Sequence, residues 1–236
     1  TELMGYDAKR WALFNIAIQP GAILAIVVLY WRTFWEVFTG LFRWDAKAVA
    51  FTRNLLLAFF PAVVLGLAFG DAIEMMLENA VIVAWALIIG GFAILVVEKY
   101  AKTSDAGGVA EISWQRSAAV GLVQCLAMIP GGSRSGATIV GAMAMGVDRK
   151  TAAEFSFFLA VPTMLGATTL ELLDNRAALA SGLGPVGWTE IGIGFAVAFV
   201  VALVVIRGFV AFVSRSGFAP FAWYRIVAGI LAIYLL

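Results

Sequence analysis

The chain has 236 residues, of which 63% are hydrophobic and only 13% charged, and its mean hydropathy is +0.97. A soluble globular domain carries about 25% charged residues, so this composition indicates a membrane protein. A net charge of +1 excludes the strongly basic surface that nucleic-acid binding requires. The single cysteine, Cys125, and the lack of histidine exclude an internal disulfide and a thiolate or imidazole metal site.

Apolar segments long enough to cross a bilayer recur along the chain. A transmembrane helix needs about 20 apolar residues for a hydrocarbon core of about 30 Å. Six segments meet this requirement, at residues 12–30, 53–69, 80–97, 152–172, 189–206 and 219–236. Their apolar runs lack the alternation of barrel strands, and Trp11, Tyr30 and Trp188 stand at segment ends, as interfacial aromatic residues do. The sequence therefore predicts an all-α, polytopic membrane protein with six transmembrane helices.

A seventh apolar stretch, residues 117–147, is interrupted by the string Pro130-Gly131-Gly132-Ser133-Arg134-Ser135-Gly136. It is either one span or a hairpin that returns to its own side. If it returns, eleven Lys and Arg residues fall in the inner loops and three outside, whereas a full crossing gives eight and six. Because short cytoplasmic loops collect positive charge, the distribution predicts a re-entrant helix hairpin.

The chain also contains an internal repeat. Met4-Gly5-x-Asp7-x-Lys9-x4-Phe14 recurs as Met145-Gly146-x-Asp148-x-Lys150-x4-Phe155, at an offset of 141 residues. The same offset lays the first three predicted spans onto the last three. The alternative is a chance similarity between two helix starts. We interpret the chain as a single transmembrane domain, residues 1–236, built from an inverted-topology repeat of residues 1–112 and 113–236.

The hairpin of the second repeat has no counterpart within the first. The offset maps residues 117–141 to positions before Thr1, and the sequence does not begin with methionine. We therefore expect a first re-entrant element upstream of Thr1.

The interrupted stretch is the candidate site. An arginine near the centre of an apolar stretch costs roughly 3 kcal/mol to insert, so Arg134 should face protein, water or an anion. Ser133 is placed to cap the helix that follows, and the N–H groups of that helix would point at the break. These groups suit a phosphate or diphosphate. A simple glycine turn with a snorkelling arginine is the alternative from the residues alone.

A resemblance to a known protein family gives this motif a more specific interpretation. Residues Pro130 to Thr138 match the PGxSRSxxT motif of the bacterial undecaprenyl-diphosphate phosphatase family, the bacitracin-resistance type. Three flanking strings are also similar to that family: Gln124-Cys125-Leu126-Ala127, Glu154-Phe155-Ser156-Phe157 and Pro220-Phe221-Ala222-x-Tyr224-Arg225. The resemblance covers essentially the whole chain.

The resemblance implies an enzyme that hydrolyses undecaprenyl diphosphate to undecaprenyl phosphate and inorganic phosphate, and so recycles the lipid carrier for peptidoglycan synthesis. It implies a multi-pass protein of the bacterial inner membrane, with its site reached from the outer face. The partners implied are the C55 lipid substrate and the bilayer, with no nucleic acid and an unknown oligomeric state. The family also implies a divalent cation, Mg²⁺ or Ca²⁺, whose ligands are not in this sequence.

The resemblance assigns roles to the motif. Arg134, Ser133 and Thr138 are the predicted catalytic residues, and Gly131, Gly132 and Ser135 are predicted to bind the substrate phosphate. The family's second motif, rich in glutamate with a PVSSTGH-like string, does not occur in this sequence. We therefore expect these residues alone to hydrolyse little substrate.

Other polar residues in the predicted spans have structural interpretations. Glu154 and Arg225 are predicted to snorkel toward the inner surface, and Gln19 to hydrogen bond between helices. The competing function is a transporter or flippase of a lipid phosphate or anion, because secondary transporters also use inverted repeats with broken helices. A third interpretation is a purely structural membrane subunit.

Overall fold

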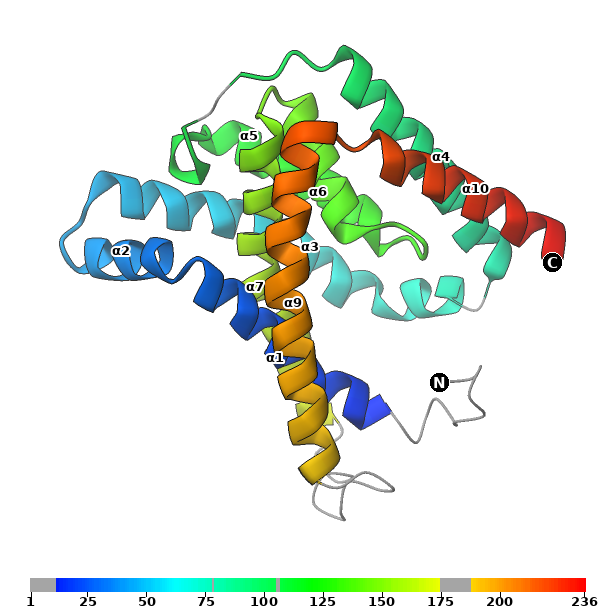
Figure 1. Ribbon diagram of the computed structural model, residues 1–236, viewed down its shortest axis with the longest axis horizontal. Coiled ribbons are helices and arrows are strands. Elements are labelled where there is room, and N and C mark those ends of the chain that lie inside the picture. Colours follow the sequence, from blue (N-terminus) through cyan, green and yellow to red (C-terminus); the bar gives the residue numbers. More distant parts are fainter. Residues whose placement is uncertain (1–11, 78, 105–106, 175–187) are drawn as a thin grey trace. The chain divides into compact units, whose positions relative to one another are not determined.

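The computed structural model describes residues 12–77, 79–104, 107–174 and 188–236 (Figure 1). The fold is helical, as predicted, and no residue in these ranges belongs to a β-strand apart from an isolated bridge between Ser104 and Val147. The helices are α1 (Ala12–Leu29), α2 (Trp31–Phe42), α3 (Ala46–Leu77), α4 (Ala80–Tyr100), α5 (Trp114–Gln124), α6 (Arg134–Ala144), α7 (Arg149–Asp174), α9 (Trp188–Ser216) and α10 (Ala219–Leu235), with 3-10 turns η2 (Val109–Glu111) and η3 (Cys125–Met128).

The chain divides into two compact units. One comprises residues up to Phe34 together with Ala160–Phe209, and the other comprises Trp35–Leu159 together with Val210–Leu236. The second unit contains the interrupted stretch of the sequence, so the candidate site can be described within it alone.

Several helices are long and apolar enough to cross a membrane. Within the described residues these are Ala46–Gly70, Ala80–Tyr100, Arg149–Leu170 and Thr189–Ser216, and a bent pair, Ala17–Leu29 with Trp31–Phe42, would make a fifth span. The remaining candidate, α10, has 17 residues, at the lower end of the length range for a span. The protein is therefore a multi-pass membrane protein with four to five candidate spans by length and composition.

The α1–α2 pair departs from the sequence prediction. The sequence predicts no span between residues 30 and 53, but Trp31–Phe42 form α2, bent by 77° from α1. Along α2 the exposed aromatic residues Trp31, Trp35, Phe38 and Phe42 recur every three or four positions, with Glu36 and Thr39 between them. This pattern is typical of a helix that lies in the headgroup region.

Close backbone contact joins α4 to α10 in the second unit. A Cβ atom on Gly229 of α10 would lie 2.7 Å from the carbonyl oxygen of Ala84 in α4. Only glycine lets the two helices approach this closely, as small residues do at helix interfaces in membranes. The pairing of α4 with α10 places Arg225, one helix turn before Gly229, beside α4.

A buried amide ties α3 to the segment that leads into α5. Asn54 in α3 is fully buried, and its Nδ2 donates to the carbonyl oxygens of Val109 at 2.9 Å and Ile112 at 2.6 Å. These two carbonyls belong to the η2 turn and its end, and the Val109 oxygen also accepts from the backbone N–H of Ile112 at 3.4 Å. Asn54 therefore fixes the start of the α5–α6 segment against α3.

A second polar junction joins three helix ends. Glu98 near the end of α4 forms an ion pair with Arg149 at the start of α7, and its Oε2 accepts from the backbone N–H of Phe218 at 3.2 Å. Phe218 is the N-cap of α10. One carboxylate thus holds α4, α7 and α10 together at their ends.

The Asn54 contacts give a stability prediction. We expect Asn54→Ala to lower the stability of the protein in detergent by roughly 2 kcal/mol, because the carbonyl oxygens of Val109 and Ile112 both lose the side-chain donor that ties them to α3. Thermal unfolding followed by circular dichroism measures this as a lower Tm. The control is Gln115→Ala, at an exposed position of α5, and an equal change of Tm in the two variants would contradict the role of Asn54.

Candidate functional site

The break between α5 and α6 is an ordered turn. Helix α5 ends at Gln124, η3 follows, and the N–H of Gly132 donates to the carbonyl oxygen of Ile129 at 2.7 Å. Gly131 has a φ of +81°, and a Cβ atom on it would lie 2.5 Å from the carbonyl oxygen of Val83 in α4. Both the left-handed backbone and the contact with α4 require glycine at this position.

Ser133 begins α6 in the way the sequence predicts. It is the N-cap residue, its Oγ accepts from the N–H of Gly136 at 3.1 Å, and its carbonyl oxygen accepts from Ala137 at 2.8 Å. The Ser133 oxygen satisfies one of the N–H groups that a helix start leaves without a partner. The positive end of the α6 dipole is therefore directed at the break.

Thr138 joins α6 to α5. Its side chain is buried, with 1% exposure for the residue, and its Oγ1 lies 3.1 Å from Gln124 Oε1 and 2.9 Å from the carbonyl oxygen of Arg134. A hydroxyl has one proton, so it donates to one of these acceptors at a time. The contact with Gln124 holds the first turn of α6 against the end of α5, and the contact with Arg134 lies within α6.

The predicted motif residues all lie at this break or in the first turns of α6. Gly131 and Gly132 form the turn, Ser133 caps the helix, and Arg134 and Ser135 are the first two helical residues, both partly buried. Because the motif is contiguous, the helix start alone brings these groups together.

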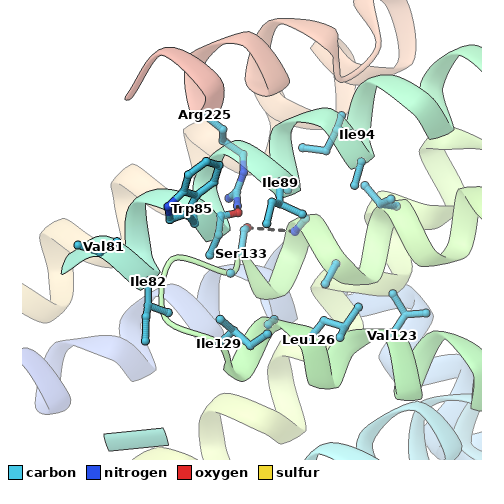
Figure 2. Close-up of a pocket in the computed structure, with 18 residues that line it drawn as sticks. Val81, Ile82, Trp85, Ile89, Ile94, Val123, Leu126, Ile129, Ser133 and Arg225 are labelled. Atoms are coloured by element: carbon cyan, nitrogen blue, oxygen red, sulfur yellow. Dashed lines mark hydrogen bonds between the residues drawn. The ribbon is translucent and has the colours of Figure 1, made fainter. Parts of the chain in front are cut away.

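A cavity of about 490 Å³ opens beside the break, within the second unit (Figure 2). Its walls come from α4, α5, η3 and α6, with Arg225 entering from α10 (Figure 2). The residues that line it are Val81, Ile82, Trp85, Ala86, Ile89, Gly90, Ala93, Ile94, Val123, Leu126, Ala127, Ile129, Gly132, Ser133, Gly136, Ala137, Val140 and Arg225.

Arg225 is the functional candidate that the sequence analysis missed. It was predicted to snorkel toward the inner surface, and that prediction is wrong. Its Nη2 donates to the carbonyl oxygens of Gly131 at 3.0 Å and Ala86 at 3.2 Å, so the guanidinium is held inward against the turn. The available signal was a charge about two turns inside an apolar segment, which usually marks a functional position.

No cluster of three or more His, Cys, Asp or Glu side chains able to hold a metal ion occurs within the described residues. The divalent cation that the family resemblance implies stays a prediction.

Comparison with known proteins adds a family assignment to this geometry. Residues 1–231 match the family described as bacitracin resistance protein BacA. The chain belongs to this family. The motif at the start of α6 is thus the motif of a BacA-family protein, in a chain that matches the family model almost from end to end.

Curated relatives of this BacA-family chain carry one name. An undecaprenyl-diphosphatase of Novosphingobium aromaticivorans is 63% identical over 233 residues, covering 99% of this chain and 86% of the relative. An undecaprenyl-diphosphatase of Rhizorhabdus wittichii is 56% identical over 93% of this chain and 81% of the relative. One of Sphingopyxis alaskensis is 52% identical over 97% of this chain and 85% of the relative.

The contact between Thr138 and Gln124 gives a second stability prediction. We expect Thr138→Val to destabilise the protein by about 1–3 kcal/mol, because the buried Gln124 oxygen loses its donor while the side-chain volume is kept. The control is Thr52→Val in α3, which loses only a bond to the carbonyl oxygen of Ala48 in its own helix. The unfolding midpoints of both variants in detergent measure the difference, and a larger loss in Thr52→Val would refute the expectation.

Proposed function

We propose that this protein is an undecaprenyl-diphosphatase, which hydrolyses undecaprenyl diphosphate to undecaprenyl phosphate and inorganic phosphate. The observation that carries the proposal is the PGGSRSGAT string at a capped helix start, in a BacA-family chain with 63% identity to a relative of that name. In the net reaction, the bond between the terminal phosphorus and the bridging oxygen breaks, and undecaprenyl phosphate is the leaving group. The oxygen of a water molecule ends on the terminal phosphorus, and loss of a water proton completes the inorganic phosphate.

The start of α6 suits the binding of the terminal phosphate. Phosphoryl transfer depends mainly on positioning and on neutralising charge, so a positively polarised helix start beside a guanidinium is well matched to it. Arg134, at the first helical position, would grip two phosphate oxygens with parallel hydrogen bonds. Ser133 Oγ already accepts from Gly136, but its own proton remains available to donate to a phosphate oxygen.

The remaining motif residues would support this cradle. The Gly132 N–H already donates to Ile129, so Gly131 and Gly132 would contribute the shape of the turn. The Ser135 hydroxyl would add a donor on the first turn. Thr138, buried against Gln124, would act by holding the carbonyl of Arg134 and with it the backbone of the phosphate-binding turn. The divalent cation stays a prediction from the family, and no step here depends on it.

The membrane topology we propose has six transmembrane helices and a re-entrant hairpin. Helices α5 and α6 have 11 residues each, which at about 1.5 Å per residue makes each roughly 16 Å long. That is about half of a 30 Å hydrocarbon core, as expected for two arms that meet at a midplane turn. Residues 1–112 and 113–236 would then form an inverted repeat, in the bacterial inner membrane with the site open to the outer face.

The alternative function is a transporter or flippase of a lipid phosphate or anion. The broken α5–α6 segment supports this alternative, because secondary transporters place their substrate sites at such breaks in helices. The two functions differ in chemistry, because a transporter moves its cargo intact and the enzyme releases inorganic phosphate.

The deciding experiment supplies undecaprenyl diphosphate to the protein, expressed from its complete gene and purified in detergent. Because detergent micelles offer no second compartment, phosphate release reports hydrolysis alone. We expect inorganic phosphate to accumulate with time in a colorimetric assay. Binding of the lipid without phosphate release would support the transporter.

Arg134 gives the sharpest test of the site. We expect Arg134→Ala to lower kcat/KM by about 10²–10³-fold or more, because the transition state loses its main charge partner. Arg134→Lys should retain part of the activity, since it keeps the charge but loses the planar two-bond grip. Arg207→Ala, at an exposed position of α9, is the matched control. Unchanged activity in Arg134→Ala with an unchanged Tm would reject the proposed site.

A further inference from the structure

Helix α2 presents a row of exposed aromatic side chains. Trp35, Phe38 and Phe42 are 60%, 54% and 75% exposed. Their rings follow one another along the helix, with centroids 6.0 Å apart for Trp35 and Phe38 and 5.0 Å apart for Phe38 and Phe42. A large apolar patch on a protein surface marks contact with a membrane or a partner.

The opposite side of α2 is fixed to the start of α3. A Cβ atom on Gly40 would lie 2.7 Å from the Cβ of Ala48 and 3.3 Å from the Cβ of Asp45. The Oδ2 of Asp45 accepts from two backbone N–H groups at the start of α3, at 3.0 Å and 3.1 Å. Phe38 and Phe42 are each two residues from Gly40, which places them about 160° around the helix axis from it. The aromatic side chains therefore lie on the side of α2 that faces away from α3.

The polar side of α2 carries a net positive charge. Arg32 lies in the first turn of the helix, and Arg43 directly follows its last residue. Eleven positions separate them, which is about three helix turns, so they share one side of the helix. Both are exposed, and neither side chain has an ion-pair partner within the described residues. The single acidic residue of α2, Glu36, lies between them, so two positive charges stand against one negative charge.

The neighbouring helices set the place of α2 in a membrane. Helix α1 has 18 residues, and at about 1.5 Å per residue its length of roughly 27 Å is close to the 30 Å or so of a hydrocarbon core. Helix α2 is bent by 77° from α1, so it runs nearly parallel to the membrane surface when α1 crosses the bilayer. The next candidate span, Ala46–Gly70, begins shortly after α2 ends. The two arginines therefore lie between two spans, where cytoplasmic loops collect positive charge.

We propose that α2 binds the anionic phospholipid headgroups of the inner leaflet, as a helix that lies in the membrane interface. The aromatic side chains enter the boundary between headgroups and acyl chains, and Arg32 and Arg43 contact lipid phosphates. Aromatic residues on one side and basic residues on the other are the pattern of such helices, which bind most strongly to anionic lipids. A guanidinium can hold a phosphate with two parallel hydrogen bonds, whereas a zwitterionic headgroup sets a cation of its own beside that phosphate.

Fluorescence quenching by brominated lipids tests the proposal without enzymatic turnover. The protein, expressed from its complete gene, is reconstituted in bilayers of phosphatidylcholine and phosphatidylglycerol in equal parts, with one of the two lipids brominated near the headgroup end of its chains. The difference between the unsubstituted protein and Trp35→Phe isolates the emission of Trp35. We expect brominated phosphatidylglycerol to quench Trp35 at least about twofold more than brominated phosphatidylcholine, because the arginines gather anionic lipid around α2.

Removal of the two arginines should abolish this preference. We expect the ratio of quenching by the two lipids to fall to about one in Arg32→Gln/Arg43→Gln. The control, Arg116→Gln/Arg215→Gln, removes the same charge at exposed positions of α5 and α9 and should keep the ratio of the unsubstituted protein. If the first double variant does not fold, salt replaces it. A rise from about 0.1 M to about 1 M NaCl shortens the Debye length from about 10 Å to about 3 Å, and should lower the ratio toward one.

Other results would overturn the proposal. Equal quenching of Trp35 by the two lipids would show that α2 does not select anionic headgroups, and an unchanged ratio in Arg32→Gln/Arg43→Gln would show that the arginines do not provide the selection. Stronger quenching by lipids brominated at the chain ends would place Trp35 in the hydrocarbon core rather than in the interface. Absence of quenching by either lipid would mean that protein, such as a second copy of this chain, covers the aromatic side chains.

Discussion

The hydrogen bond from Arg225 to the carbonyl oxygen of Gly131 joins α10 to the turn before α6, where we propose that the phosphate binds. In a hydrocarbon core each backbone polar group without a partner costs several kcal/mol, so a broken helix survives there only if its turn is satisfied internally. Here Gly132 bonds to Ile129, Gly136 bonds to Ser133, and the guanidinium supplies the donor for Gly131. The turn before α6, the proposed anion-binding end of that helix, is therefore held by a charge contributed from 94 residues away.

The same arginine explains a small residue on α4. A Cβ atom on Gly90 would lie 2.6 Å from Nη2 of Arg225 and 3.2 Å from the carbon at the centre of its guanidinium. A methyl group there would push the guanidinium away from Gly131, because the arginine side chain is the more flexible partner. The close approach of α10 to α4 at Gly229, the space over Gly90 and the bond to Gly131 thus form one arrangement. It places charge beside an otherwise apolar cavity.

The local features of the molecule followed from the sequence, and the features made by distant contacts did not. The apolar runs predicted the cores of the long helices, and the Pro-Gly-Gly-Ser string predicted both the break and the cap at Ser133, because those signals act within a few residues. The aromatic helix α2 was not predicted because its 12 residues are too few to span a bilayer. The recurrence of its aromatic residues every three or four positions was the signal that indicated a helix. Arg225 was misread because its partners lie on α4 and in the turn, and its depth within the apolar segment is a signal of function that does not by itself distinguish snorkelling from an inward bond.

The geometry of Ser133 also limits what this helix start does in the reaction. Its oxygen accepts from the N–H of Gly136, so one lone pair is directed into the helix, and the hydroxyl proton is left to donate to a ligand together with one further lone pair. The 236 residues include no histidine that could act as a base and remove that proton. An unassisted serine is a weak nucleophile. Ser133 is therefore better suited to donate to a phosphate oxygen than to attack phosphorus, which agrees with the proposed role of this end of α6 in holding the phosphate.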